Sequence, residues 1–145
     1  MDRNSISPAE FKHQLKQLDH SFAMLASNIV FVEGKRDKQA MQRLGGRRIY
    51  TISGRIPAVC EEVANDKVEK VIILSDLDRR GNEMVEKACE ELARYSIKCD
   101  REQRLQFGRI LKVKYFESLD RAYEKFVEEK IKGKKNNNLR GVLNG

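Results

Sequence analysis

Short apolar segments recur along the chain and predict the strands of a buried sheet. Residues 28–32 and 70–74 carry β-branched and aliphatic side chains on both faces, which is typical of strands covered by helices in a parallel sheet. Residues 48–52 alternate between apolar and polar side chains, and residues 97–99 are a shorter candidate. We therefore expect these four segments to be strands.

Segments with a helical spacing of apolar residues separate the strands. Helices are predicted over residues 37–44, 57–64, 82–96 and 118–131. Residues 100–114 are less regular and predict a short helix, a turn at Gly108 and a further strand. The alternation of strands and helices predicts an α/β fold, with a central, mostly parallel sheet flanked by helices on both faces.

A further helical stripe precedes the first strand. Residues 7–10 (Ser-Pro-Ala-Glu) have the composition of a helix start, and apolar residues then recur at spacings of three and four from Phe11 to Leu25. This stripe could pack on the sheet or pair two subunits, and we expect it to pack on the core. A chain of 145 residues suits one domain. The expected organisation is an N-terminal helix over 1–26, the domain proper over 27–131 and a basic, disordered tail over 132–145.

The positive charge is concentrated at the C-terminal end. The chain carries a net charge of +7, but residues 130–145 hold five basic residues and no acidic one. The other residues hold 24 basic and 22 acidic side chains, so the body is nearly neutral. No apolar run approaches the roughly 18 residues of a membrane span, and the N-terminus does not look like a signal peptide. The expectation is a cytoplasmic protein without a membrane partner.

The three cysteines do not form a recognisable pattern. Cys60, Cys89 and Cys99 are widely spaced and include no Cys-x-x-Cys pair, so the sequence indicates neither a zinc site nor a disulfide framework. We interpret them as ordinary packing residues in a reducing compartment.

Acidic residues follow the two most apolar strands directly. Glu33 comes after residues 28–32, and Asp76 and Asp78 come after residues 70–74. Ligands bind beyond the carboxyl ends of parallel strands, so the three carboxylates would converge if these strands are neighbours. Converging carboxylates repel one another unless a cation lies among them, and oxygen ligands favour Mg²⁺ or Mn²⁺. Alternatively, the Asp-x-Asp pair could be only a helix cap and a solvated turn.

Glycine and basic residues surround these acids and suit a phosphate-containing substrate. The candidate phosphate or nucleic-acid contacts are Gly34, Lys35, Arg36, Asp37, Arg79, Arg80 and Gly81. The two glycines permit close backbone approach, and two helices begin nearby with free N–H groups. Surface flexibility explains the arginines nearly as well, and Asp37 could simply cap its helix.

Together these residues resemble the Toprim domain, a module of topoisomerases, bacterial primases and several nucleases. Its pattern is Glu-Gly after the first strand, often with Asp three residues later, and Asp-x-Asp-x-x-Gly after the third. Residues 33–37 and 76–81 match both parts, and the likeness covers about residues 27–115. The resemblance implies a Toprim (Rossmann-like) fold in which Asp76 and Asp78 bind Mg²⁺ (or Mn²⁺), and Glu33 binds metal or acts as general acid or base.

The chain has no sequence for the modules that accompany Toprim in larger enzymes. There is no Walker A sequence, no zinc-binding region and no separate domain to carry a nucleophilic tyrosine. The resemblance therefore implies a stand-alone protein, most simply a small metal-dependent nuclease, which is a phosphodiester hydrolase acting on RNA or DNA. The alternative is a non-catalytic nucleic-acid-binding or assembly subunit, with a protein partner in a larger processing complex.

Overall fold

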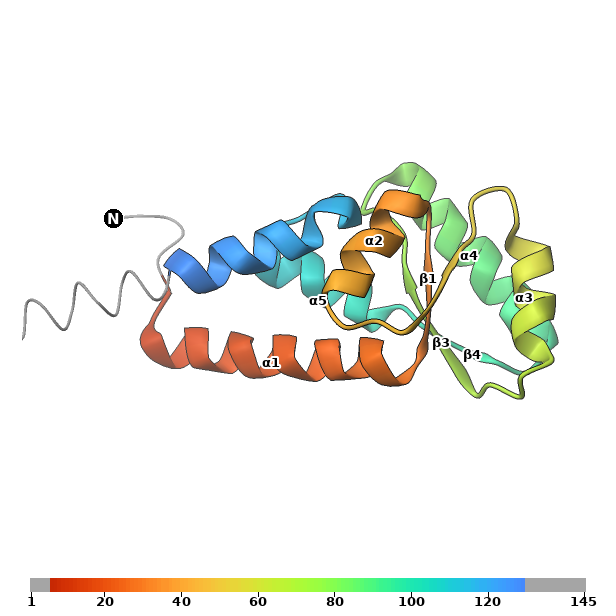
Figure 1. Ribbon diagram of the computed structural model, residues 1–145, viewed down its shortest axis with the longest axis horizontal. Helices are drawn as coiled ribbons and strands as arrows, with labels where there is room; N and C mark the ends of the chain where they lie inside the picture. The colour runs from red at the N-terminus through yellow and green to blue at the C-terminus, as the bar shows by residue number, and fades with distance from the viewer. Residues whose placement is uncertain (1–5, 130–145) are drawn as a thin grey trace, which may run out of the picture.

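The computed structural model of the protein describes residues 6–129 (Figure 1). The predicted tail over 132–145 lies outside the described residues. The helices are α1 (Pro8–Ser27), α2 (Lys35–Arg43), α3 (Ile56–Ala64), α4 (Arg79–Arg94), α5 (Glu102–Leu111) and the short 3-10 helix η1 (Phe116–Ser118), which continues as an α-helix over 119–129. The strands are β1 (Ile29–Val32), β2 (Arg48–Thr51), β3 (Lys70–Leu74) and β4 (Lys98–Asp100).

The strands of the described chain form one sheet in the order β2-β1-β3-β4, and every neighbouring pair is parallel. This confirms the predicted α/β fold. β1 and β3 are neighbours at the centre, and Val32 pairs with Leu74 at their carboxyl ends. The residues that follow these two strands therefore begin at the same edge of the sheet.

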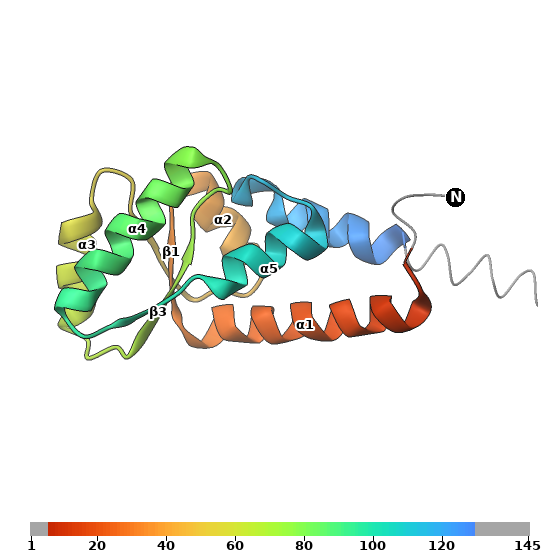
Figure 2. The same ribbon diagram turned by 180° about the vertical axis from the view of Figure 1, so that it is seen from behind.

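Alternate side chains of the two central strands point into two separate cores. Val30, Val32, Ile72 and Leu74 pack with α1, α2, α5 and the helix over 119–129. The residues between them pack with α3 and α4 on the opposite face. Figures 1 and 2 show these two layers of helices on either side of the sheet. The complete burial of both central strands explains why neither has a polar face in the sequence.

The segment 100–114 differs from the prediction. Instead of a short helix, a turn at Gly108 and a strand, α5 runs without interruption through Gly108 to Leu111. Packing explains why position 108 is a glycine, because a Cβ atom there would overlap Leu77 Cδ1. The glycine marks the place where Leu77 lies against α5, and it does not break the helix.

Two of the cysteines also differ from the prediction. Cys89 in α4 and Cys99 in β4 form a disulfide, with their Cα atoms 5.4 Å apart. The packing of α4 against the neighbouring strand brings together side chains that the sequence separates by ten residues. Only Cys60 has the expected role of a buried packing residue, and burial raises the pKa of its thiol to about 11.

No helix in the described part of the chain has both the length and the apolar character needed to cross a membrane.

Candidate metal centre

The carboxyl edge of the sheet carries a pocket of about 270 Å³. Its lining comes from the ends of β1, β2 and β3 and from the first turns of α2 and α4, and consists of Glu33, Gly34, Asp37, Ser53, Asp76, Asp78 and Arg80. The pocket therefore contains all three predicted metal ligands. It also contains Ser53, which had no signal in the sequence.

Glu33 and Asp76 contact each other directly in this pocket. The Asp76 N–H points to Glu33 Oε2 at 3.4 Å, and the Phe116 N–H donates to Asp76 Oδ1 at 2.9 Å. Burial is the main cause that raises the pKa of Glu33 from 4.5 to about 7, and the side chain of Asp76 and the charge of Asp78 add to it. Glu33 therefore holds its proton more tightly than a free carboxyl group does, mainly because it is buried.

The other two acidic residues of the pocket cap helices. The Gly81 N–H donates to Asp78 Oδ1 at 2.7 Å at the start of α4, and the Gly34 N–H donates to Asp37 Oδ2 at 2.9 Å at the start of α2. Burial raises the pKa of Asp37 above its ordinary value. The capping role considered for Asp37 is thus present, and Asp78 caps a helix in addition to lining the pocket.

The donor set fits a hard divalent cation. Within residues 6–129, no three carboxylate, histidine or cysteine side chains are already gathered into a metal-binding cluster. Oxygens of Asp76 and Asp78 instead accept backbone N–H groups. Nevertheless, Glu33, Asp37, Asp76 and Asp78 line one pocket, and the charges of Asp76 and Asp78 add to the effect of burial on the pKa of Glu33. Oxygen-only donors of this kind are those that Mg²⁺ and Mn²⁺ prefer.

Arg104 lies beneath the pocket and was not identified in the sequence. It is only 5% exposed, and its guanidinium donates to the carbonyl oxygens of Ser75 (2.7 Å) and Asp76 (2.5 Å) and to Asn82 Oδ1 (2.7 Å). Burial lowers its pKa, whereas the charges of the three pocket carboxylates raise it. Arg104 thus fixes the backbone that presents the aspartates, and it supplies a buried positive charge behind them.

The predicted basic contacts separate into two groups. Arg80 lines the pocket and donates to Ser53 Oγ at 3.3 Å. Arg79 is almost fully exposed and pairs with Glu83 on α4 at 3.5 Å, away from the acids. Lys35 and Arg36 are exposed on the first turn of α2. Of these four basic residues, only Arg80 lines the acidic pocket.

The two motif glycines have different roles. A Cβ atom on Gly81 would overlap the carbonyl group of Asp76, because the first turn of α4 lies directly against the segment after β3. A Cβ atom on Gly34 would make only an ordinary contact of 3.8 Å with Asp37 Oδ2, and its φ of −142° suits any residue. Close backbone approach therefore requires glycine at 81 but not at 34.

Gly81→Ala is expected to lower the free energy of unfolding by about 2–3 kcal/mol, because backbone must move to relieve the overlap. Gly34→Ala is the matched control and should change stability by less than about 0.5 kcal/mol. Urea unfolding of both variants measures the difference. Equal stabilities would show that the segment after β3 does not lie against α4.

The electrostatics of Glu33 predict a pH dependence of stability in metal-free buffer. Folding raises the pKa of Glu33 from 4.5 to about 7, so its protonated form favours the folded state. This contribution is complete below pH 4.5 and is lost as the pH rises to about 7. Glu33→Gln, which mimics the neutral form, should therefore melt higher than the wild type at pH 8 in EDTA and similarly near pH 4.5. A lower melting temperature for the variant at pH 8 would contradict the raised pKa.

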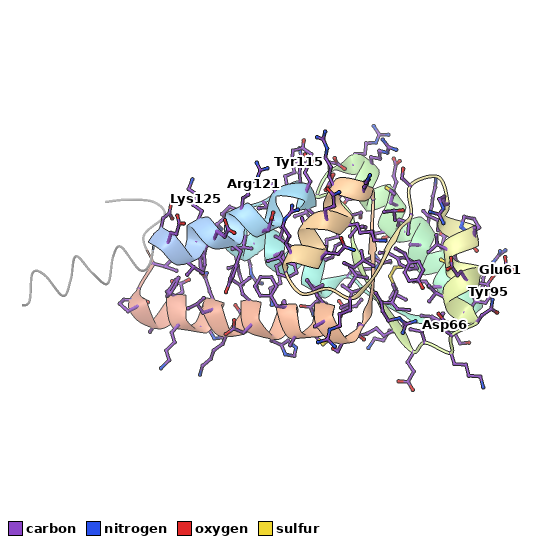
Figure 3. All side chains as sticks on the ribbon, in the orientation of Figure 1. Glu61, Asp66, Tyr95, Tyr115, Arg121 and Lys125 are labelled. Carbon is purple, nitrogen blue, oxygen red and sulfur yellow. A yellow bond between two sulfur atoms is a disulfide. The ribbon has the colours of Figure 1, made fainter. Side chains whose placement is uncertain are left out.

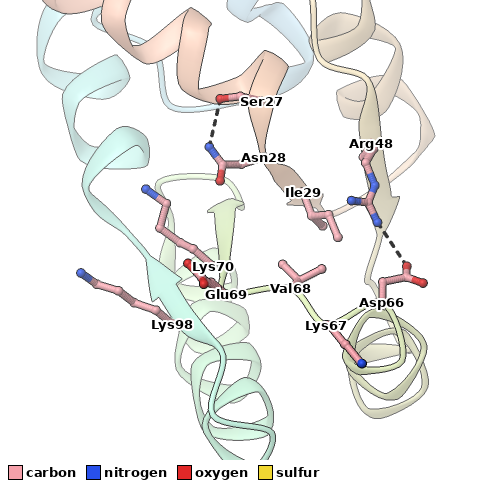
Figure 4. A pocket seen from close by; sticks show the side chains of 10 residues that line it. All are labelled: Ser27, Asn28, Ile29, Arg48, Asp66, Lys67, Val68, Glu69, Lys70 and Lys98. Atoms are coloured by element: carbon pink, nitrogen blue, oxygen red, sulfur yellow. Dashed lines mark hydrogen bonds and ion pairs between the residues drawn. The ribbon is translucent and has the colours of Figure 1, made fainter.

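A second pocket, of about 530 Å³, lies at the opposite edge of the sheet (Figure 4). It is lined by the starts of all four strands, and its basic side chains are Arg48, Lys67, Lys70 and Lys98. Arg48 pairs with Asp66 at 3.2 Å and Lys70 with Asp100 at 3.5 Å, so much of the positive charge is neutralised. This pocket contains none of the motif residues and lies at the wrong end of the strands for an α/β active site.

Comparisons with known proteins agree with the geometry of the acidic pocket. The sequence profile of the Toprim domain matches residues 28–110, which include all three carboxylates. A UPF0292 protein of Methanocaldococcus jannaschii is 34% identical over 71 residues, which are 48% of this chain and 56% of that protein. A UPF0292 protein of Pyrococcus horikoshii is 33% identical over 96 residues, or 65% of this chain and 73% of that protein.

A solved structure of a protein from Aquifex aeolicus is similar in fold to this chain. It is 26% identical, with a TM-score of 0.56, and the superposition covers 79% of this chain and 99% of that one. The names of these relatives state no activity.

Proposed function

The chain belongs to the Toprim domain family, whose members typically act on nucleic acids with the help of a metal ion, and on this premise we propose that it is a small Mg²⁺-dependent nuclease. The reaction is the hydrolysis of a phosphodiester bond in RNA or DNA. The observation that carries the proposal is the convergence of Glu33, Asp76 and Asp78 on one pocket at the carboxyl ends of neighbouring strands.

Glu33, Asp76 and Asp78 are the residues that would hold Mg²⁺ or Mn²⁺. When bound, the ion would polarise the phosphate and neutralise the negative charge that develops on it as water attacks. Arg104 keeps the segment after β3 in place through its hydrogen bonds to the Ser75 and Asp76 carbonyl oxygens. Arg80, at the rim of the pocket, is placed to contact a neighbouring phosphate.

Glu33 is also placed to move a proton during hydrolysis. The attacking water must lose a proton, and the oxygen released from phosphorus must gain one. Glu33 Oε2 lies beside the Asp76 N–H inside the pocket, and we expect the phosphate to enter this pocket. A carboxylate in this position can act as general base toward the water, or as general acid toward the leaving oxygen.

A second candidate function is a non-catalytic nucleic-acid-binding subunit. It is favoured by the absence of a ready-made metal cluster within residues 6–129 and by the engagement of Asp76 and Asp78 with backbone N–H groups. In this case the acids would serve mainly to shape the loop and cap α4. Such a protein would bind nucleic acid without turning it over and would act with a larger partner.

Incubation of the purified protein with end-labelled RNA and DNA oligonucleotides separates the two functions. A nuclease should cleave at least one of them in Mg²⁺ or Mn²⁺ and should stop when EDTA is added. Binding without any cleavage, in either metal and with either nucleic acid, would reject the nuclease and favour the binding subunit.

A further inference from the structure

An exposed aromatic side chain lies in a segment that is hydrogen-bonded to the loop carrying Asp76. Tyr115 is 48% exposed, although most large apolar and aromatic side chains of the described chain are buried. It lies in the segment that joins α5 to η1, which had no recognisable role in the sequence. Figure 3 shows Tyr115 along the same upper edge of the molecule as Arg121 on the helix that follows.

Two hydrogen bonds, one to the backbone and one to a side chain, fix this segment to the loop that carries the aspartates. The Leu77 N–H donates to the Lys114 carbonyl oxygen at 2.7 Å, and the Phe116 N–H donates to Asp76 Oδ1 at 2.9 Å. Tyr115 lies between these two attachment points. Phe116 is fully buried in the core and anchors the segment from below. The position of the Tyr115 ring is therefore set relative to Asp76 by short, direct connections.

A cationic side chain lies close to the Tyr115 ring. Lys114 Nζ lies over the Tyr115 ring, 5.7 Å from its centre, and the residue is 48% exposed. A cleft of about 400 Å³ is lined by α2 and by residues that follow Tyr115 in the chain, and its cationic side chains are Arg36, Arg43 and Arg121. Arg43 pairs with Asp120 at 2.5 Å, and Glu117 is the acidic member of the lining. Arg36 and Arg121 have no ion pair in the described chain.

An aromatic face with a cation above it, next to a cleft with exposed arginines, is the arrangement that binds single-stranded nucleic acid. Bases stack on the ring, and the cations contact the phosphates that follow. A paired base inside a duplex is already stacked on both of its neighbours, so it cannot also stack on an isolated ring. The combination therefore favours an unpaired strand over a duplex.

We propose that Tyr115, Lys114, Arg36 and Arg121 form a binding surface for a single-stranded segment of the substrate, with one unpaired base stacked on Tyr115. The inference rests on the proposed function, because it places the scissile phosphate in the acidic pocket and the stacked base beside it. It specifies the substrate as RNA or DNA that is unpaired next to the cleavage site. Tyr115 is then a residue that selects the substrate and takes no part in the chemical step.

The test uses oligonucleotides that contain 2-aminopurine, a base whose fluorescence is quenched by stacking. The protein has no tryptophan, so the probe can be excited without a strong background. Affinity is measured by titration in EDTA and, at short times, in Mg²⁺, for a single strand and for a blunt duplex of the same sequence. RNA and DNA versions show which sugar is preferred.

Wild-type protein should bind the single strand more tightly than the duplex and should quench the probe. Tyr115→Ala should weaken binding of the single strand about tenfold and remove the quenching, because an aromatic stack contributes on the order of 1–3 kcal/mol. Tyr115→Phe keeps the ring and should behave like the wild type. Arg121→Ala should remove about one phosphate contact. The slope of log affinity against log salt concentration should therefore become shallower by about 0.7.

Tyr95→Ala is the matched control, since Tyr95 is similarly exposed (41%) but follows the last turn of α4, well away from Tyr115 in Figure 3. It should change neither affinity nor quenching. This inference is wrong if Tyr115→Ala binds the single strand and quenches the probe as the wild type does. It is also wrong if the wild type binds the duplex as tightly as the single strand. In both cases the nuclease proposal stands. If the wild type binds no oligonucleotide in either buffer, both are rejected.

Discussion

Asp76→Asn is expected to reduce Mg²⁺-dependent cleavage by more than about 100-fold while leaving the fold intact. Residues that only orient metal ligands typically change activity or metal affinity by about 10- to 100-fold, and a ligand should have a larger effect. Asparagine has the same shape, and its Oδ1 can still accept the Phe116 N–H that holds the loop. The variant therefore removes the charge of Asp76 and keeps its structural contact.

The measurement is the initial rate of cleavage of the best oligonucleotide, with circular dichroism to verify the fold. Asp66→Asn is the control, because Asp66 is an exposed carboxylate at the opposite edge of the sheet and pairs only with Arg48 there. It should cleave at the wild-type rate. Full activity in Asp76→Asn would mean that the acidic pocket is not the active site or that a contaminating nuclease is responsible.

Arg104→Met is expected to be the most destabilising single substitution near the pocket, lowering the free energy of unfolding by about 3–5 kcal/mol. The guanidinium satisfies the Ser75 and Asp76 carbonyl oxygens and Asn82 Oδ1, and methionine would leave all three without this partner. The loss of a buried positive charge beneath three carboxylates adds to the cost. A typical domain is stable by only about 5–15 kcal/mol, so the effect is easily measured by urea unfolding.

Arg101→Met provides a control three residues earlier in the chain. Arg101 is exposed and pairs with Glu86 at 2.6 Å, an interaction that should contribute less than about 1 kcal/mol. Arg104→Lys keeps the charge but loses the forked geometry, so its stability should be intermediate. Similar stabilities for Arg101→Met and Arg104→Met would contradict the structural role assigned to Arg104.

The elements that depend on local pattern were predictable from the sequence. β1 and β3 are apolar on both faces because each contributes side chains to both cores, and this is why the parallel sheet was evident. The motif acids follow those strands directly, so their convergence required only that the strands be neighbours. The structure confirms this adjacency, since Val32 pairs with Leu74.

Features that depend on tertiary contacts were not predictable. Arg104 reaches the pocket from α5, 28 residues after Asp76, and nothing in its local sequence distinguishes it from a surface arginine. The Cys89–Cys99 disulfide depends on how α4 packs on β4, a contact that the spacing of ten residues does not specify. In the sequence alone, Gly108 indicates a turn. In the structure it lies within an unbroken helix, and the glycine leaves room for Leu77 against α5.

The proposed site combines residues of both kinds. Glu33, Asp76 and Asp78 belong to recognisable motifs, whereas Ser53 lines the pocket, and Tyr115 adjoins the Asp76 loop, from segments without a motif. The sequence could therefore indicate the type of chemistry. The surface that would select the substrate became visible only when the chain was folded.

The most direct test of the metal centre is a crystal of the protein soaked in Mn²⁺, with anomalous diffraction used to locate the ion. The account predicts an anomalous peak in the acidic pocket within bonding distance of at least two of Glu33, Asp76 and Asp78. It also predicts that the peak disappears when Asp76 and Asp78 are both replaced by asparagine. A fully soaked crystal with no peak in this pocket, or a peak there that survives the double substitution, would contradict the assignment.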